Sequence, residues 1–274
     1  MLDNGLLKYY KTIGDMRGRL RVNKIPNLST LAKRFGVRKY EIEGKEYFCK
    51  DREKSMVEAE VLISQLYPQL GIPSAIYIPA NRTYNDNESV ISNSVRSENN
   101  NSGVYFLKHL LALEEGRNRR IHKFFTSDCV KQIATMQALD LATANCDRHE
   151  GNFFIQTEDP FGKGKAEGIT TIDYGASGAG IDHGHSLRYY NYFNREGATY
   201  IHSSWQDVIE DLKSKKAVLS VVRPQELAET VGKGIDLIPK TAQDIKETIG
   251  YEVSPNYVEA LQRSFEEVAE ELER

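Results

Sequence analysis

The chain has 274 residues, enough for one large domain or two lobes, and its formal net charge of −3 excludes the global basic field of a non-specific nucleic-acid binder. Its three cysteines are far apart and form no CxxC pair, which argues against a disulfide framework. The N-terminal residues show no signal-peptide pattern, and no apolar run reaches the roughly 20 residues that a membrane-spanning helix needs. We therefore expect a cytoplasmic protein, or one delivered into a host cytosol.

The first part of the chain is basic and mixed in character. Residues 1–35 carry many lysines and arginines, and Gly14, Gly18 and Pro26 interrupt any long helix. This composition predicts an N-terminal extension. Its charges indicate either a solvated segment or a docking surface for an anionic partner.

A β-hairpin and a helix are predicted next. Residues 38–50 alternate apolar and charged positions around a turn at Glu43-Gly44, and the second strand delivers Lys50 at its end. Ser55 is the predicted N-cap of the helix, with Glu58 as its capping-box partner. Apolar residues then recur at helical spacing until a stop at residues 71–73: Val57, Val61, Leu62, Leu66 and Leu70.

Two strands, a linker and a helix follow. Residues 75–79 and 89–96 are predicted strands. The Asn- and Ser-rich residues 99–103 form a linker that marks the predicted boundary between two lobes. An apolar stripe over residues 104–116 predicts a helix.

The chemically distinctive stretch is residues 145–152, Asn-Cys-Asp-Arg-His-Glu-Gly-Asn. A long predicted helix, capped by Ser127 or Asp128, leads directly into it. A second signal, Ile172-Asp-Tyr-Gly175, follows further on, and we expect a hairpin to connect the two. The remaining predicted elements are a loop over residues 176–197 and helices at 205–213, 224–231 and from 253 to the end.

These residues suit phosphoryl transfer. That reaction needs metal ions on the phosphates, a cation beside them and a carboxylate that orients the attacking hydroxyl. The sequence supplies Lys50 on a strand, an acid on the next helix, and then Asp147, Asn152 and Asp173. Mg²⁺ prefers hard oxygen ligands, which Asn152 and Asp173 offer. The joint order and spacing predict an ATP- and Mg²⁺-dependent phosphotransferase.

Both signals also resemble the motifs of known kinases. Residues 147–152 with residues 172–175 look like the DRHxxN and DFG-type motifs of the phosphatidylinositol 3/4-kinase family. With Asn145 included, the stretch is similar to the NxDRHxxN motif of HipA-like bacterial kinases. The resemblance covers about residues 38–180. It implies a protein-kinase-like fold, with ATP as substrate and Mg²⁺, or Mn²⁺, as the metal.

The resemblance also implies roles for single residues. Asp147 matches the catalytic-loop Asp that orients the acceptor hydroxyl, and His149 matches a residue that contacts phosphate or shares the acid–base task. Lys50 matches the phosphate-contacting Lys, with Glu60 as its helical partner and Glu58 as the rival for that place. Asn152 and Asp173 match the metal-binding pair. No GxGxxG precedes Lys50, so the phosphate-covering loop stays unlocated.

The acceptor is less well defined. The segment over residues 176–192 carries only one Arg or Lys, Arg188, which disfavours an anionic lipid headgroup and favours a serine or threonine of a protein. A phosphoinositide kinase, and a pseudokinase that acts as a nucleotide-binding interaction module, remain the alternatives. The sequence gives no oligomeric state, and no nucleic-acid partner is expected.

Together these patterns predict an α+β, two-lobed, protein-kinase-like fold. A small antiparallel sheet with one helix would form the N-lobe, and the C-lobe would be mainly helical. The predicted divisions are an N-terminal extension over residues 1–35, an N-lobe over 36–103 and a C-lobe over 104–274 that holds the catalytic loop.

Overall fold

The computed structural model describes about half of the chain. The described residues are 37–42, 45–84, 87–93, 103–106, 126–145, 152–158, 165–172, 174 and 222–273. The predicted N-terminal extension, the loop over residues 176–197 and the helix over 205–213 lie outside them.

A four-stranded antiparallel sheet has the strand order β1-β2-β4-β3. Its first two strands form the predicted hairpin, in which Ile42 pairs with Lys45 across a two-residue connection. The third strand starts two residues later than predicted, because Ala75 donates its N–H to Thr171 O of another sheet at 3.0 Å. The strands are β1 (Val37–Ile42), β2 (Lys45–Arg52), β3 (Tyr77–Tyr84) and β4 (Asn87–Asn93).

A second, three-stranded antiparallel sheet has the order β5-β6-β7. Its strands are β5 (Gly103–Phe106), β6 (Phe153–Thr157) and β7 (Ala166–Thr171). The pairing of β6 with β7 agrees with the hairpin expected between the two chemical signals. The helix predicted from residue 104 is wrong over residues 104–106, because Val104, Tyr105 and Phe106 pair along β6.

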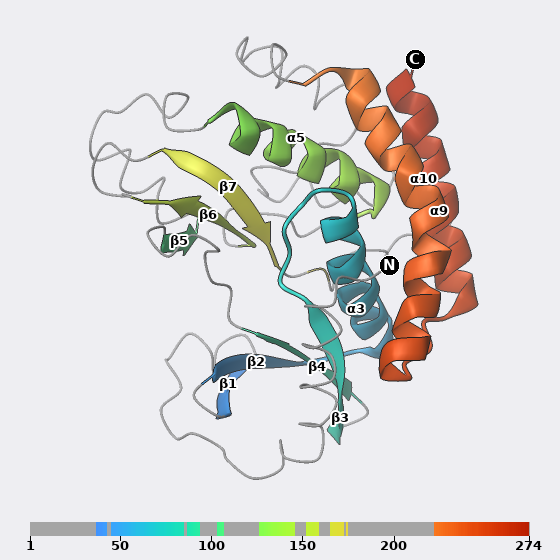
Figure 1. Cartoon of the computed structure of the whole chain (residues 1–274). Helices are drawn as coiled ribbons and strands as arrows, with labels where there is room; N and C mark the ends of the chain where they lie inside the picture. The colour runs from blue at the N-terminus through green and yellow to red at the C-terminus, as the bar shows by residue number, and fades with distance from the viewer. Residues whose placement is uncertain are drawn as a thin grey trace, which may run out of the picture.

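The central helix α3 (Lys54–Gln69) lies between the four-stranded sheet and the C-terminal helices (Figure 1). Every residue from Val57 to Tyr67 is buried, because β3 and β4 cover one side of the helix and α9 covers another. The predicted cap is wrong by two residues: Glu53, not Ser55, is the N-cap, and Val57 N–H bonds to Glu53 O at 3.0 Å. The helix ends before Gly71, whose φ of +85° favours glycine.

Helix α5 (Ser127–Ala142) crosses the three-stranded sheet against β7 (Figure 1). The predicted caps, Ser127 and Asp128, are wrong by one or two residues, because Thr126 is the N-cap and its Oγ1 accepts from Cys129 N–H at 3.2 Å. Burial raises the pKa of the Cys129 thiol to about 12, so this thiol stays protonated.

Two long C-terminal helices, α9 (Pro224–Ile249) and α10 (Pro255–Glu273), lie side by side and cover α3 and α5 (Figure 1). The prediction for α10 is confirmed within two residues at its start. The helix predicted over residues 224–231 is far too short. The helix continues past Pro239, which has no N–H to donate to Ile235 O. Gln262 of α10 donates its Nε2–H to that carbonyl at 3.1 Å instead, so the carbonyl keeps a hydrogen bond.

One apolar core connects these layers. Buried side chains of α3, β4, β7, α5, α9 and α10 form a single contiguous cluster, so the sheets and the C-terminal helices share one interior. The largest of its fully buried side chains come mostly from α3, with one residue after β7 and one from α10: Tyr67, Leu62, Ile63, Leu66, Tyr174 and Phe265. No helix within the described residues is both long and apolar enough to cross a membrane.

The packing of α10 on α9 depends on Gly234. A methyl group at this position would overlap the ring of Phe265, a fully buried residue of α10. We therefore expect Gly234→Ala to destabilise the protein by about 1–3 kcal/mol, although alanine is the better helix former. Urea unfolding followed by circular dichroism measures the change.

Gly232, two residues earlier on the same helix, is the matched control. A methyl group there meets no neighbouring atom within 4 Å. Gly232→Ala should therefore raise the free energy of unfolding by up to about 1 kcal/mol, the helix-propensity gain. Equal effects of the two substitutions would contradict the close approach of Phe265.

Candidate active site

The structure brings together two of the predicted site residues, Lys50 and Glu60. Lys50 lies on β2, between Val37 of β1 and Val90 of β4, and its side chain crosses to the face that α3 covers. Its Nζ lies 3.3 Å from Oε1 of Glu60, and the side chains are 7% and 0% exposed. A lysine and a glutamate buried this far keep their charges by pairing with each other.

The Lys50 ammonium has a second neighbour of suitable chemistry. It lies 4.9 Å from the ring centroid of Tyr77 on β3, the distance of a cation–π contact. Tyr77 is fixed in turn, because its N–H donates to Ser64 Oγ of α3 at 3.0 Å. The sheet and α3 thus hold the lysine from two sides.

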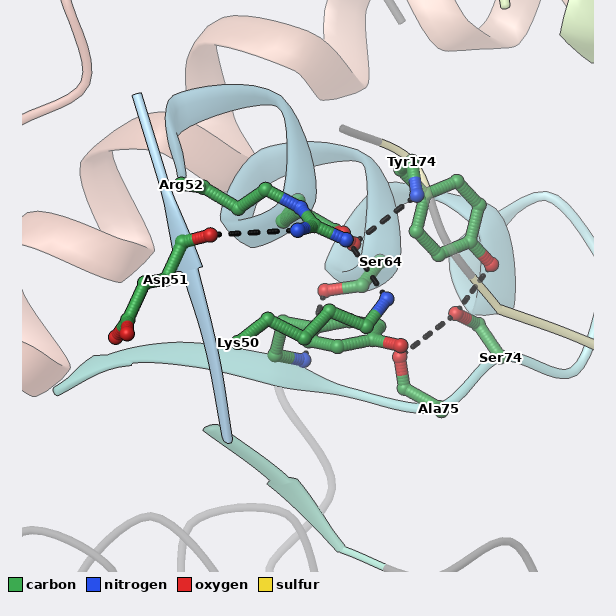
Figure 2. A network of polar contacts seen from close by, with 9 residues as sticks. Lys50, Asp51, Arg52, Ser64, Ser74, Ala75 and Tyr174 are labelled. Carbon is green, nitrogen blue, oxygen red and sulfur yellow. Dashed lines mark hydrogen bonds and ion pairs between the residues drawn. The ribbon is translucent and has the colours of Figure 1, made fainter. Parts of the chain in front are cut away.

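The other carboxylate oxygen of Glu60 holds the segment that contains the second predicted signal. Tyr174 donates its N–H to Glu60 Oε2 at 3.0 Å (Figure 2). Tyr174 directly follows Asp173 in the sequence. One carboxylate therefore joins Lys50 of the four-stranded sheet to the residue beside the predicted metal ligand. Glu60 and Tyr174 are 114 positions apart in the chain.

Asn152 directly precedes β6. It is buried, and its backbone carbonyl accepts from Ile172 N–H at 3.1 Å. Ile172 directly precedes Asp173 in the sequence, so the backbone pairs Asn152 with the neighbour of its predicted metal-binding partner. An amide oxygen and a carboxylate are hard ligands that fit Mg²⁺.

The remaining predicted site residues lie outside the described part of the chain. These are Asp147, His149 and Asp173, and their roles stay predictions. Within the described residues no three His, Cys, Asp or Glu side chains gather as a metal cluster. The structure does describe Asn145 and Asn152, the two residues that bracket the predicted catalytic stretch.

The entry to the catalytic stretch is held by a buried polar network that the sequence analysis missed. Asp140, near the end of α5, accepts from Tyr67 Oη of α3 at 2.8 Å and from Asn145 Nδ2 at 3.2 Å through the same oxygen. Asn145 N–H also bonds to Asp140 O at 2.8 Å. Ala144 between them has a φ of 49°, a left-handed conformation uncommon for alanine.

The rings of three tyrosines connect this network to the ion pair. Tyr67 stacks edge-on against Tyr174 with centroids 5.1 Å apart, and Tyr77 stacks edge-on against Tyr174 at 6.4 Å. Contacts therefore run from Lys50 through Glu60 and Tyr174 to Tyr67, and from there to Asp140. The sequence contains two weak signals for this network. One is an acid, Asp140, between apolar residues of a predicted helix, and the other is Tyr174 in place of the Phe of the DFG-type motif.

A solved structure has a similar arrangement of elements. The chain is similar to the crystal structure of the proinflammatory kinase CtkA of Helicobacter pylori, with a TM-score of 0.50, 14% sequence identity, and coverage of 86% of this chain and 87% of that one. No family model and no curated protein matches the sequence. At this identity the similarity concerns the fold alone. The chain thus has the kinase-like α+β fold that its sequence predicts.

Proposed function

We propose that the protein is an ATP- and Mg²⁺-dependent kinase that phosphorylates serine or threonine of a protein. The observation that carries this proposal is the Lys50–Glu60 pair, whose second carboxylate oxygen accepts from Tyr174 N–H. A lysine held by a buried acid is the cation that phosphoryl transfer needs beside the phosphates. A purely structural ion pair would not require Tyr174, the middle residue of the Asp-Tyr-Gly sequence, to bind the same carboxylate.

Each residue has a proposed task in this reaction. Lys50 neutralises phosphate charge, and Glu60 fixes its ammonium in place. Asn152 and Asp173 would hold Mg²⁺, which would neutralise the negative charge that develops on the phosphates. Asp147 orients the acceptor hydroxyl and accepts its proton, and His149 contacts phosphate or shares this task.

Transfer of γ-labelled phosphate from ATP tests the proposal. We expect label in protein acceptors with the wild type, and a loss of about 100-fold or more with Lys50→Met, because one preorganised charge at the phosphates is removed. Asp173→Ala should lose as much. Lys246→Met, at an exposed lysine of α9, is the control and should transfer at the wild-type rate.

The acceptor that becomes labelled distinguishes a protein kinase from a lipid kinase and from a nucleotide-binding interaction module. The assay is run with a protein lysate, with the chain itself and with phosphoinositide vesicles. Label in the vesicles alone would replace the protein kinase by a lipid kinase. Nucleotide binding without label in any acceptor would replace it by a nucleotide-binding interaction module.

A further inference from the structure

The Tyr174 hydroxyl lies in a buried cluster that the proposed reaction does not use. Tyr174 is 0% exposed, and its Oη is 2.5 Å from Ser74 Oγ and in contact with Thr171 Oγ1. Figure 2 shows the hydroxyl end of the Tyr174 ring next to Ser74, which itself bonds to Ala75. A phenylalanine would fill the same space, so packing alone does not explain a tyrosine here.

The hydroxyl protons of this cluster can form a directed chain. Ser74, Thr171 and Tyr174 have three hydroxyl protons but make four contacts, two with each other's oxygens and two with the carbonyls of Pro73 and Ala75 at 3.1 Å. Pro73 O already accepts from Thr171 N–H at 2.9 Å. Two directed arrangements use these contacts: from Thr171 through Tyr174 and Ser74 to Ala75 O, or from Ser74 through Tyr174 and Thr171 to Pro73 O. The first leaves no group unsatisfied, because Pro73 O keeps its bond from Thr171 N–H.

Such a directed chain of hydroxyls is cooperative, because each hydrogen bond polarises the next. Tyr174 supplies its middle member. It ties the residue after Asp173 to residues 73–75, which are already bonded to the end of β7 by Ala75 N–H to Thr171 O at 3.0 Å. Together with the N–H bond to Glu60, the cluster holds Tyr174 from both its backbone and the far end of its ring.

We propose that the Tyr174 hydroxyl, held by Ser74 and Thr171, is a positioning group that fixes the segment of Asp173 for Mg²⁺ binding. This inference rests on the proposed function, because Mg²⁺ binding by Asp173 and Asn152 is part of it. Both sequence neighbours of Asp173 are hydrogen-bonded: Ile172 N–H to Asn152 O, and Tyr174 N–H to Glu60 Oε2. In this proposal the Tyr174 hydroxyl keeps Tyr174 in place for the second bond. Groups that orient metal ligands typically govern metal affinity by about 10- to 100-fold.

Binding of a fluorescent ATP analogue to the full chain, titrated with Mg²⁺, tests this inference without needing turnover. We expect Tyr174→Phe to raise the Mg²⁺ concentration at half-saturation about tenfold. Binding of the analogue in excess EDTA should stay within about twofold of the wild type, since Lys50 and Glu60 are unchanged. Ser74→Ala removes a hydrogen-bond partner of the same hydroxyl at a half-buried position and should shift the titration in the same direction.

Tyr67→Phe is the matched control. Tyr67 is equally buried, its hydroxyl also has two partners, Asp140 and Thr143, and its ring packs against Tyr174. Removing that hydroxyl should lower the thermal midpoint by a similar amount but leave the Mg²⁺ half-saturation point unchanged.

Three outcomes would overturn the inference. Equal shifts in Tyr174→Phe and Tyr67→Phe would indicate general loosening rather than positioning. A wild-type titration curve in both Tyr174→Phe and Ser74→Ala would leave the proposed kinase intact and remove the role of the hydroxyl. A wild type that binds the analogue without any response to Mg²⁺ would remove the metal site of the proposed function, and this inference with it.

Discussion

Replacing Glu60 by alanine is expected to lower the free energy of unfolding by about 3–5 kcal/mol and to abolish phosphoryl transfer. The substitution leaves the Lys50 ammonium buried without its carboxylate, and it removes the acceptor of Tyr174 N–H. A buried charge that has lost its counter-charge is among the costliest defects in a folded protein. Urea unfolding measures the first effect, and the labelled-ATP assay measures the second.

The double variant Lys50→Met/Glu60→Leu separates the two effects. It removes both charges and keeps apolar groups of similar size, so most of the lost stability should return. Phosphoryl transfer should not return, because no cation remains beside the phosphates. A double variant as active as the wild type would contradict the role of the pair.

A second ion pair shows why burial, and not distance, decides how much an ion pair contributes to stability. Lys246 Nζ lies only 2.7 Å from Glu252 Oε1, closer than Lys50 to Glu60, and the hydrogen bond from Lys246 holds the pKa of Glu252 below its usual range. The Glu252 side chain is nevertheless 67% exposed, so water screens the attraction. Glu252→Ala should barely change stability, despite the shorter distance.

Asp140→Ala is expected to have the second-largest effect, about 2–4 kcal/mol of unfolding free energy. The change strips a buried acceptor from Tyr67 Oη and from the Asn145 amide, and each stranded donor costs about 1–3 kcal/mol. Tyr67 keeps its contact with Thr143 Oγ1 at 3.2 Å, which limits the loss. Because Asn145 stands two residues before Asp147, kcat should fall more than KM for ATP rises.

Two variants on the same helix test this explanation. Asp140→Asn keeps an acceptor oxygen for Tyr67 and should recover much of the stability. Thr135→Val removes a hydroxyl that bonds within α5, to Lys131 O at 2.9 Å, and should leave kcat unchanged. A loss of kcat in Thr135→Val equal to that in Asp140→Ala would mean that α5 responds to any substitution.

The predictions from the sequence succeeded where a local pattern carries the information. Alternating residues around Glu43-Gly44 predicted the β1–β2 hairpin, and the apolar stripe after Pro255 predicted α10. The pairing of Lys50 with Glu60 was expected from the resemblance to known kinases, with Glu58 as the rival, and the contact between Lys50 and Glu60 is present in the structure.

The predictions that failed depend on contacts between residues far apart in the sequence, which a short stretch of sequence does not show. The length of α9 was missed because Gly232, Gly234 and Pro239 break its helical pattern, whereas α10 supplies the compensating contacts. Residues 103–106 were misassigned because pairing with β6 decides their conformation. The hydroxyl cluster joins Ser74 to Tyr174 across 100 positions, and small polar residues leave no periodic signal.

The packing of α3 on α9 has a consequence for the order in which the protein assembles during synthesis. Gln69 Nε2 donates to Thr241 Oγ1 at 2.9 Å, a contact that spans 172 positions of the chain. Domains fold as their residues leave the ribosome, N-terminal parts first, and contacts this distant in sequence close late. The helix that bears Glu60 is therefore synthesised early, but α9 covers it only after α9 has left the ribosome. Until then, the helix that holds the Lys50–Glu60 pair lacks part of its packing.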